Sequence, residues 1–387
     1  MLWKFPAQRR RPNKGQHPMP THLIALLATF FVIGLSGPAY AEPVTGLPLV
    51  LATAMAAGNT PAAGVLVLRD GRVADIAVRG VRRVDGADPV QLNDAWMIGS
   101  TSKSQTVAMI ARLADRGVLS WRAPLSKMLP DLAAGMRPEY RGVTLTQLLS
   151  HHSGLPENIS DMAFFETFFT DRRPASEQRL AYITRALSEA PAYPPGTAFG
   201  YSNTGFLIAA LVAERATGLT YERLMRREVF GPLGMTSAGF GALGPGGLSG
   251  HEAGKPAPAS NPDMFAPAGN LHMSLRDWSR FCLDQLAGAK GHGKLLSPPA
   301  YRLMQTAQPN GPSGLDWGVQ ARIAGRTGPV LVHGGSDGRW FAYVVLFPGS
   351  GNGVLVVDNA STAMGGDTAA LAVLASLLPS LAPEAVK

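Results

Sequence analysis

Ser100 and Lys103 stand three positions apart, directly after the apolar run 96–98. Residues three apart share one face of a helix, so this spacing places a hydroxyl beside an amine. A serine attacks a carbonyl carbon only when a neighbouring group takes its proton. A lysine can do so once burial or nearby positive charge lowers its pKa. The pair therefore predicts acyl transfer through a serine ester, with an N-capping serine and a solvated lysine as the alternative interpretation.

Two later segments carry polar side chains in positions that suit a cleft. Tyr201-Ser202-Asn203 lies between a Pro/Gly-rich turn and an apolar helical pattern, so Tyr201 can present its hydroxyl there. A packed aromatic and a helix N-cap at Asn203 are the alternatives. The segment 333–336, His-Gly-Gly-Ser, follows an apolar strand, and its glycines would let a substrate backbone approach closely. A simple turn between two strands is the alternative there.

A different nucleophile is conceivable at Ser336, because residues 334–338 read Gly-Gly-Ser-Asp-Gly and match Gly-x-Ser-x-Gly. That motif must open into a helix and needs a histidine later in the chain. Residues 339–347 have a strand pattern, and no histidine follows His333. Both requirements fail, so we interpret the match as accidental.

The charge distribution argues against nucleic acid as a partner. The 387 residues carry a net charge of +8, but five basic residues precede residue 42 in a stretch without Asp or Glu. The remainder has a net charge of only +3 and no basic cluster interleaved with aromatic residues. We therefore expect a small-molecule or peptide substrate and no nucleic-acid partner.

The first 41 residues are typical of a secretory signal peptide. A basic region precedes the apolar run 23–35, and 39–41 read Ala-Tyr-Ala, a small-x-small cleavage pattern. An uncleaved anchor is less favoured, because 13 apolar residues are too few to span a bilayer comfortably. Translation from Met19 and twin-arginine export through 9–10 are alternatives. We predict a periplasmic or secreted protein with no stable membrane span after signal removal.

Cysteine and histidine usage predicts neither a disulfide nor a metal site. Cys282 is the only cysteine and lies in an apolar helical stripe, which is typical of a buried thiol. His151 and His152 are adjacent and would diverge on any regular element. We expect no metal or organic cofactor.

The hydrophobic pattern predicts an α/β (α+β) fold. Strands at both chain ends and helices between them indicate an antiparallel sheet built from both ends, flanked by helices, with an inserted, mostly helical lobe over approximately 120–300. Residues 42–387 would form this one domain, with Ser100 at the seam where clefts form. Asp70-Gly71 predicts a hairpin turn, and 241–258 a mobile loop. The expected strands are 64–69, 73–78, 95–98, 317–323, 329–333, 339–347 and 353–359; the expected helices are 49–57, 106–116, 144–150, 175–189, 204–217, 221–229, 275–287 and 368–378.

Together these motifs resemble the serine β-lactamase and penicillin-binding protein superfamily. Ser100-x-x-Lys103, Tyr201-x-Asn203 and His333-Gly-Gly occur in its order and rough spacing. The chain is most similar to the class C-like branch, which includes D-Ala-D-Ala carboxypeptidases, D-aminopeptidases and related esterases. The resemblance covers about 55–375 and includes the segments 145–156, 194–196, 230–235 and 267–271.

The resemblance implies a role for each motif residue. Ser100 would be the nucleophile, Lys103 would accept its proton alone or with Tyr201, and Tyr201 would relay a proton to the leaving group. Asn203 would hold Lys103 or a substrate amide. Backbone N–H groups of Ser100 and Ser336 would form the oxyanion hole, and His333, Gly334 and Gly335 would line the substrate site. His151 and His152 match a recurrent segment that we interpret as scaffold.

The third motif departs from the superfamily's common Lys-Thr-Gly. His333 takes the place of a lysine whose cation meets the substrate carboxylate, and unperturbed imidazole is mostly neutral at pH 7. Arg339 could supply a compensating charge or lie solvated. The departure favours a monomeric hydrolase of esters, amides or D-amino-acid peptides. The alternatives are a true class C-like β-lactamase or D-Ala-D-Ala carboxypeptidase, and a non-catalytic homologue that binds peptidoglycan or acts as a sensor.

Overall fold

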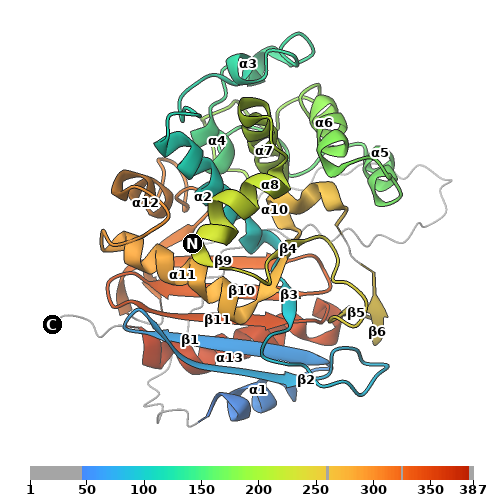
Figure 1. Ribbon diagram of the computed structural model, residues 1–387, viewed down its shortest axis with the longest axis vertical. Coiled ribbons are helices and arrows are strands. Elements are labelled where there is room, and N and C mark those ends of the chain that lie inside the picture. The colour runs from blue at the N-terminus through green and yellow to red at the C-terminus, as the bar shows by residue number, and fades with distance from the viewer. Residues whose placement is uncertain (1–45, 259–260, 324–325, 383–387) are drawn as a thin grey trace, which may run out of the picture. The chain divides into compact units, whose positions relative to one another are not determined.

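A six-stranded antiparallel sheet is the main scaffold of the computed structural model, which describes residues 46–258, 261–323 and 326–382. The predicted signal peptide, 1–41, lies outside the described residues. The strand order is β2-β1-β11-β10-β9-β8 (Figure 1). The sheet therefore joins the first two strands of the chain to the last four, which confirms the predicted sheet from both chain ends. Its strands are β1 (Ala62–Arg69), β2 (Arg72–Gly80), β8 (Gly318–Ile323), β9 (Arg326–Ser336), β10 (Phe341–Phe347) and β11 (Asn352–Asp358).

The first hairpin follows directly from its turn residues. Asp70 and Gly71 connect β1 to β2 with φ angles of 50° and 72°. Two successive left-handed residues form the turn that matches strand twist, and aspartate followed by glycine tolerates that conformation well. The hairpin predicted from Asp70-Gly71 is confirmed.

Side chains alternate across the sheet and build two separate cores. Val65 and Val356 face the core shared with the terminal helices α1 (Leu47–Met55) and α13 (Gly366–Leu381). Their neighbours Leu66 and Leu355 face the larger core on the opposite side. Helix α11 (Leu275–Ala289) covers that side (Figure 1). Each face of the sheet is thereby buried, which stabilises the long central strands.

The inserted lobe is mostly helical but also contains short strands. It packs above the sheet in Figure 1, around helices α2 and α7. Strands β3, β7 and β4 form a small second sheet, and β5 pairs with β6. The elements are α2 (Ser102–Asp115), α3 (Leu125–Met128), α4 (Leu145–Leu149), α5 (Met162–Glu166), α6 (Ala175–Ala186), α7 (Asn203–Thr217), α8 (Tyr221–Met225), α9 (Gly231–Leu233), α10 (Ala266–Gly269), α12 (Pro298–Gln305), β3 (Ala95–Met97), β4 (Gly239–Phe240), β5 (Gly250–Glu252), β6 (Lys255–Ala257) and β7 (Leu271–Ser274).

The expectation of a loop over 241–258 is wrong for its second half, where β5 and β6 form a hairpin. The buried side chain of His251 fixes this hairpin to the main body. Its Nε2 accepts a hydrogen bond from the backbone N–H of Val84 at 3.0 Å, and its Nδ1 donates to the backbone oxygen of Asn359 at 2.8 Å. Glycine and proline content predicted a mobile loop there, but the hydrogen bonds of the buried His251 side chain hold the segment in place.

A second difference lies at the end of helix α8. The α-helix predicted over 221–229 stops at Met225 and continues as a π-helical turn, Arg226–Phe230. The buried carboxylate of Glu228 in this turn pairs with Arg112 at 3.2 Å and with Arg116 at 2.7 Å. The wider turn carries the residue that makes this ion-pair cluster, which sequence periodicity alone does not indicate.

The seam between sheet and helical lobe is unusually close at two glycines. A single-turn helix, η1 (Gly99–Thr101), leads into α2 and packs against β9 and α10. A Cβ atom on Gly335 would lie 2.3 Å from the backbone oxygen of Ile98, and one on Gly99 would lie 2.6 Å from the backbone nitrogen of Ser336. Both positions therefore require glycine for the backbones to meet. Strand β9 runs through 333–336, so this segment is strand rather than turn.

Candidate active site

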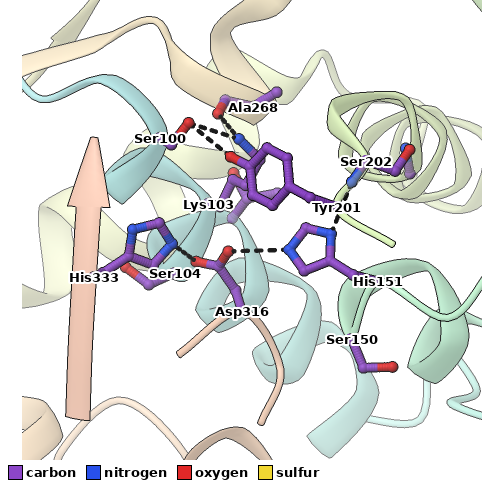
Figure 2. A network of polar contacts seen from close by, with 12 residues as sticks. Ser100, Lys103, Ser104, Ser150, His151, Tyr201, Ser202, Ala268, Asp316 and His333 are labelled. Carbon is purple, nitrogen blue, oxygen red and sulfur yellow. Dashed lines mark hydrogen bonds and ion pairs between the residues drawn. The ribbon is translucent and has the colours of Figure 1, made fainter. Parts of the chain in front are cut away.

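The hydroxyl of Ser100 lies at this seam, at the start of the helix that carries Lys103. The phenol of Tyr201 donates a hydrogen bond to Ser100 Oγ at 2.7 Å, and Lys103 Nζ lies 3.1 Å from the same oxygen (Figure 2). Tyr201 comes from the loop that enters α7, so the structure joins two segments a hundred positions apart. One hydroxyl thus contacts two groups that can move its proton.

Lys103 is fully buried, and burial changes its chemistry. Its Nζ donates to the backbone oxygen of Ala268 at 2.5 Å and lies 4.8 Å from the centre of the Tyr201 ring. Burial lowers the pKa of Lys103 to about 7, although the carboxylates of Asp316 and Glu157 act in the opposite direction. A substantial fraction of the amine is therefore neutral near pH 7 and can accept the proton of Ser100.

The pKa of Tyr201 is shifted in the other direction, upward. Burial, together with the negative charge of Asp316, raises the pKa of the Tyr201 phenol well above its ordinary value. The resting phenol therefore keeps its proton and donates it to Ser100 Oγ. In this arrangement Lys103 is the base, and Tyr201 is a proton donor that can pass its proton onward.

The backbone around Ser100 meets strand β9 at the contact with η1. Ser336 pairs with Phe341 at the end of β9, and the missing side chain of Gly335 lets this strand pack against the backbone of Ser100. The backbone nitrogens of Ser100 and Ser336 consequently both lie where η1 meets β9. Two such donors are the usual means of stabilising negative charge on a carbonyl oxygen.

The structure gives Asn203 different contacts from those expected. Its Nδ2 donates to Asn158 Oδ1 at 3.1 Å, and the N-cap of α7 is Ser202, whose Oγ accepts from Gly205 N. Among the hydrogen bonds of the described residues, none joins Asn203 to Lys103, which is held instead by Ala268. The other expected role of Asn203, contact with a substrate amide, stays a prediction.

His333 is also engaged within the protein. Its Nε2 lies 2.9 Å from Asp316 Oδ2, and its Nδ1 lies 2.8 Å from the backbone oxygen of Gly334 (Figure 2). The imidazole packs edge-on against Trp317 and is only 7% exposed. The side chain expected to face a substrate carboxylate therefore faces a carboxylate of the protein.

Asp316 and His151 are the site residues whose contacts sequence reasoning missed. Asp316 is fully buried; burial alone would raise the pKa of its carboxyl, but His333 and His151 lower it to about 2. His151 stacks on the ring of Tyr201 at 4.6 Å and accepts a hydrogen bond from Ser202 N at 3.1 Å. We expected His151 to be scaffold, and its contacts with Tyr201 agree with a supporting role. No spacing in the sequence links Asp316 to these partners.

Comparison with known proteins agrees with this geometry. The family model described as Beta-lactamase matches residues 49–377. The chain belongs to the Beta-lactamase family. Membership of this family and the hydrolases among its relatives support assignment of the chain as a serine hydrolase.

Similar proteins include penicillin-binding proteins and a carboxypeptidase. Penicillin-binding protein 4* of Bacillus subtilis is 29% identical over 38% of this chain, which spans 31% of that relative. The D-alanyl-D-alanine-carboxypeptidase/endopeptidase AmpH of Escherichia coli is 27% identical, covering 76% of this chain and 79% of that protein. A solved D-stereospecific amidohydrolase from Streptomyces shares the fold with a TM-score of 0.65 and 24% identity, over 83% of this chain and 96% of that one.

The described residues also bear on membrane association and metal binding. None of their helices is both long and apolar enough to cross a bilayer. Within the same residues, no group of three or more His, Cys, Asp or Glu side chains is placed to hold a metal ion.

Proposed function

We propose that this chain is an exported serine hydrolase that forms an acyl-enzyme on Ser100 and acts on esters, amides or D-amino-acid peptides. The observation that carries the proposal is the position of Ser100 Oγ, within hydrogen-bond reach of both Lys103 and Tyr201. A base whose pKa is about 7 and a protonated phenol on the same oxygen suit acyl transfer at neutral pH.

In acylation, Ser100 Oγ bonds to the substrate carbonyl carbon while its proton passes to Lys103. The N–H groups of Ser100 and Ser336 bind the resulting oxyanion. As the bond to the leaving group breaks, Tyr201 gives its proton to the leaving group and regains one from Lys103. In deacylation, water adds to the ester carbon and loses its proton through Tyr201 or Lys103. Ser100 then leaves as the alcohol, and the site returns to its starting state.

A true class C-like β-lactamase or a D-Ala-D-Ala carboxypeptidase is the nearest alternative. The likeness to AmpH, described as a D-alanyl-D-alanine-carboxypeptidase/endopeptidase, favours the second of these. The third motif argues against both, because a histidine stands where a lysine cation would meet a substrate carboxylate.

A non-catalytic peptidoglycan-binding or sensor homologue is the remaining alternative. Such a protein would have no need for a desolvated lysine beside a serine, because burying an amine costs stability. Export is proposed on the basic, apolar and small-residue layout of residues 1–41, which lie outside the described part of the chain.

The decisive test is acyl-enzyme formation at one serine. The protein would be mixed with p-nitrophenyl acetate, quenched rapidly and analysed by peptide mass spectrometry, with parallel kinetics on nitrocefin and a D-alanyl-D-alanine peptide. We expect an acetyl adduct on the Ser100 peptide, and turnover lower by on the order of 10⁴-fold or more in Ser100→Ala.

Ser104→Ala is the matched control, because Ser104 lies on the same helix and its hydroxyl is bound to the backbone oxygen of Thr101. That variant should retain the adduct. Equal turnover in Ser100→Ala and wild type, or no adduct with any of the three substrates, would contradict the proposal.

A further inference from the structure

Asp316 lies next to His333 of the third motif. Its side-chain contacts are not ones that a strand or helix would make by itself. It precedes β8, has a left-handed φ of 71°, and its side chain is fully buried. Its carboxylate reaches two histidines from different parts of the chain, with Oδ2 2.9 Å from His333 Nε2 and Oδ1 3.6 Å from His151 Nε2. A buried carboxylate in a disfavoured backbone conformation persists only when its surroundings hold it there.

These contacts involve both ring nitrogens of each imidazole. His151 Nδ1 accepts from Ser202 N–H, so its single proton sits on Nε2 and points toward Asp316. His333 has an acceptor at each nitrogen, the oxygen of Gly334 at Nδ1 and the carboxylate of Asp316 at Nε2. Both ring nitrogens of His333 therefore face acceptors that belong to the protein.

His333 is consequently engaged within the protein at both ring nitrogens. Its Nε2 faces the adjacent Asp316 carboxylate, and its Nδ1 faces the backbone oxygen of Gly334. Arg339, the other candidate cation, donates to Glu252 at 3.1 Å and to the backbone oxygen of Pro258 at 2.7 Å. Neither side chain is oriented to receive a substrate carboxylate.

We propose that Asp316 is a specificity-determining residue that engages His333 and so excludes a carboxylate anchor from the third motif. The cleft then selects acyl donors that carry no carboxylate beside the scissile bond, such as neutral esters and amides. This inference rests on the proposed function, since it concerns which substrates acylate Ser100.

Two matched substrates test the inference: p-nitrophenyl butyrate, which is neutral, and the p-nitrophenyl monoester of glutaric acid, which is anionic. Their kcat/KM ratio would be measured in wild type, Asp316→Asn, His333→Lys and the double variant. The ratio is informative because a general loss of folding or catalysis lowers both values together.

We expect wild type to prefer the neutral ester. In His333→Lys the new ammonium is drawn to Asp316, so the anionic-to-neutral ratio should change by less than about 3-fold. In the double variant the ammonium is free, and one charge-assisted hydrogen bond should raise the ratio by about 10-fold or more. A wild-type preference for the anionic ester, or an equal rise in the single and double variants, would overturn the inference. Loss of the Ser100 adduct itself would instead overturn the proposed function.

Histidine ring nitrogen NMR provides a second readout that needs no double variant. Wild type should show a His333 Nε2–H proton that exchanges slowly with solvent, because it faces the buried Asp316 carboxylate. The signal should be absent in His333→Gln and exchange faster in Asp316→Asn. Rapid exchange in wild type would contradict the inference.

Discussion

Two buried polar clusters lie side by side at this site, and burial acts on them in opposite ways. Lys103 is buried without a carboxylate in contact, so the pKa of its amine falls to about 7. Asp316 is equally buried but contacts two imidazoles, so its pKa falls to about 2 and its charge is retained. The presence or absence of a counter-charge decides whether desolvation neutralises a group or fixes its charge.

The cluster around Lys103 is the reactive cluster, and the cluster around Asp316 is the positioning cluster. A group poised near neutrality can give and take protons during turnover, whereas a paired buried charge holds its neighbours in place. The two clusters meet through His151, whose ring stacks on Tyr201 while its Nε2 faces Asp316. Proton transfer at Ser100 and orientation of the third motif are therefore assigned to different residues.

The largest expected effect comes from making the reactive cluster permanently charged. Lys103→Arg places a guanidinium beside Ser100 that does not lose its proton, so no base remains. We expect kcat/KM on p-nitrophenyl acetate to fall by about 10³–10⁴-fold at every pH from 6 to 9. Lys103→Gln is the control for side-chain length and should fall similarly. An active Lys103→Arg enzyme would mean that another group removes the proton.

Removing the counter-charge of the positioning cluster should cost folding stability. Asp316→Ala removes the carboxylate that His333 and His151 both face and leaves a buried polar cluster without one partner, which should cost about 3–5 kcal/mol in the free energy of unfolding. Because the folded pKa of Asp316 is lowered to about 2, its contribution is present above the unfolded value of 3.8 and is lost as pH falls through 2. Urea unfolding of wild type and variant at pH 7 measures the difference. A variant as stable as wild type would contradict the pairing.

Replacing the unpaired amine of Lys103 should instead increase folding stability. Lys103→Met replaces it with an apolar side chain of similar size and should raise the free energy of unfolding by about 1–2 kcal/mol at pH 7 while abolishing turnover. The pKa of Lys103 is about 7 in the folded protein and 10.5 in the unfolded chain, so wild-type stability rises with pH between these values. The advantage of methionine should therefore shrink between pH 7 and pH 10. A gain in the free energy of unfolding that does not depend on pH would contradict the lowered pKa of Lys103.

The smallest expected effect is a shift of the pH profile by the second nearby carboxylate. Glu157 stabilises the ammonium form of Lys103, so Glu157→Gln should lower the pKa of Lys103 further. The acid limb of kcat/KM should then move to lower pH, with the plateau value nearly unchanged. Glu252→Gln, at an ion pair with Arg339, is the control that should leave the limb in place. A shift to higher pH would contradict the assignment of the limb to Lys103.

Local sequence patterns predicted much of the fold and the reactive half of the site. Helical spacing placed Ser100 beside Lys103, turn residues placed the first hairpin, and motif order brought Tyr201 and His333 to the same cleft. The positioning half was not predictable in this way. Asp316 reaches its partners only through tertiary packing, and an isolated aspartate before a tryptophan carries no periodic or turn signal. The π-helical turn at Glu228 and the hairpin at His251 were missed for the same reason, because buried polar contacts from distant segments determine both.

The central claim is that a neutral, buried Lys103 activates Ser100. The most direct measurement is the rate at which a fluorophosphonate modifies Ser100 as a function of pH, in wild type and in Lys103→Arg. We predict a rate in wild type that rises through a single ionisation near pH 7, and no measurable modification of the variant. A rate independent of pH, or modification of the variant at the wild-type rate, would contradict it.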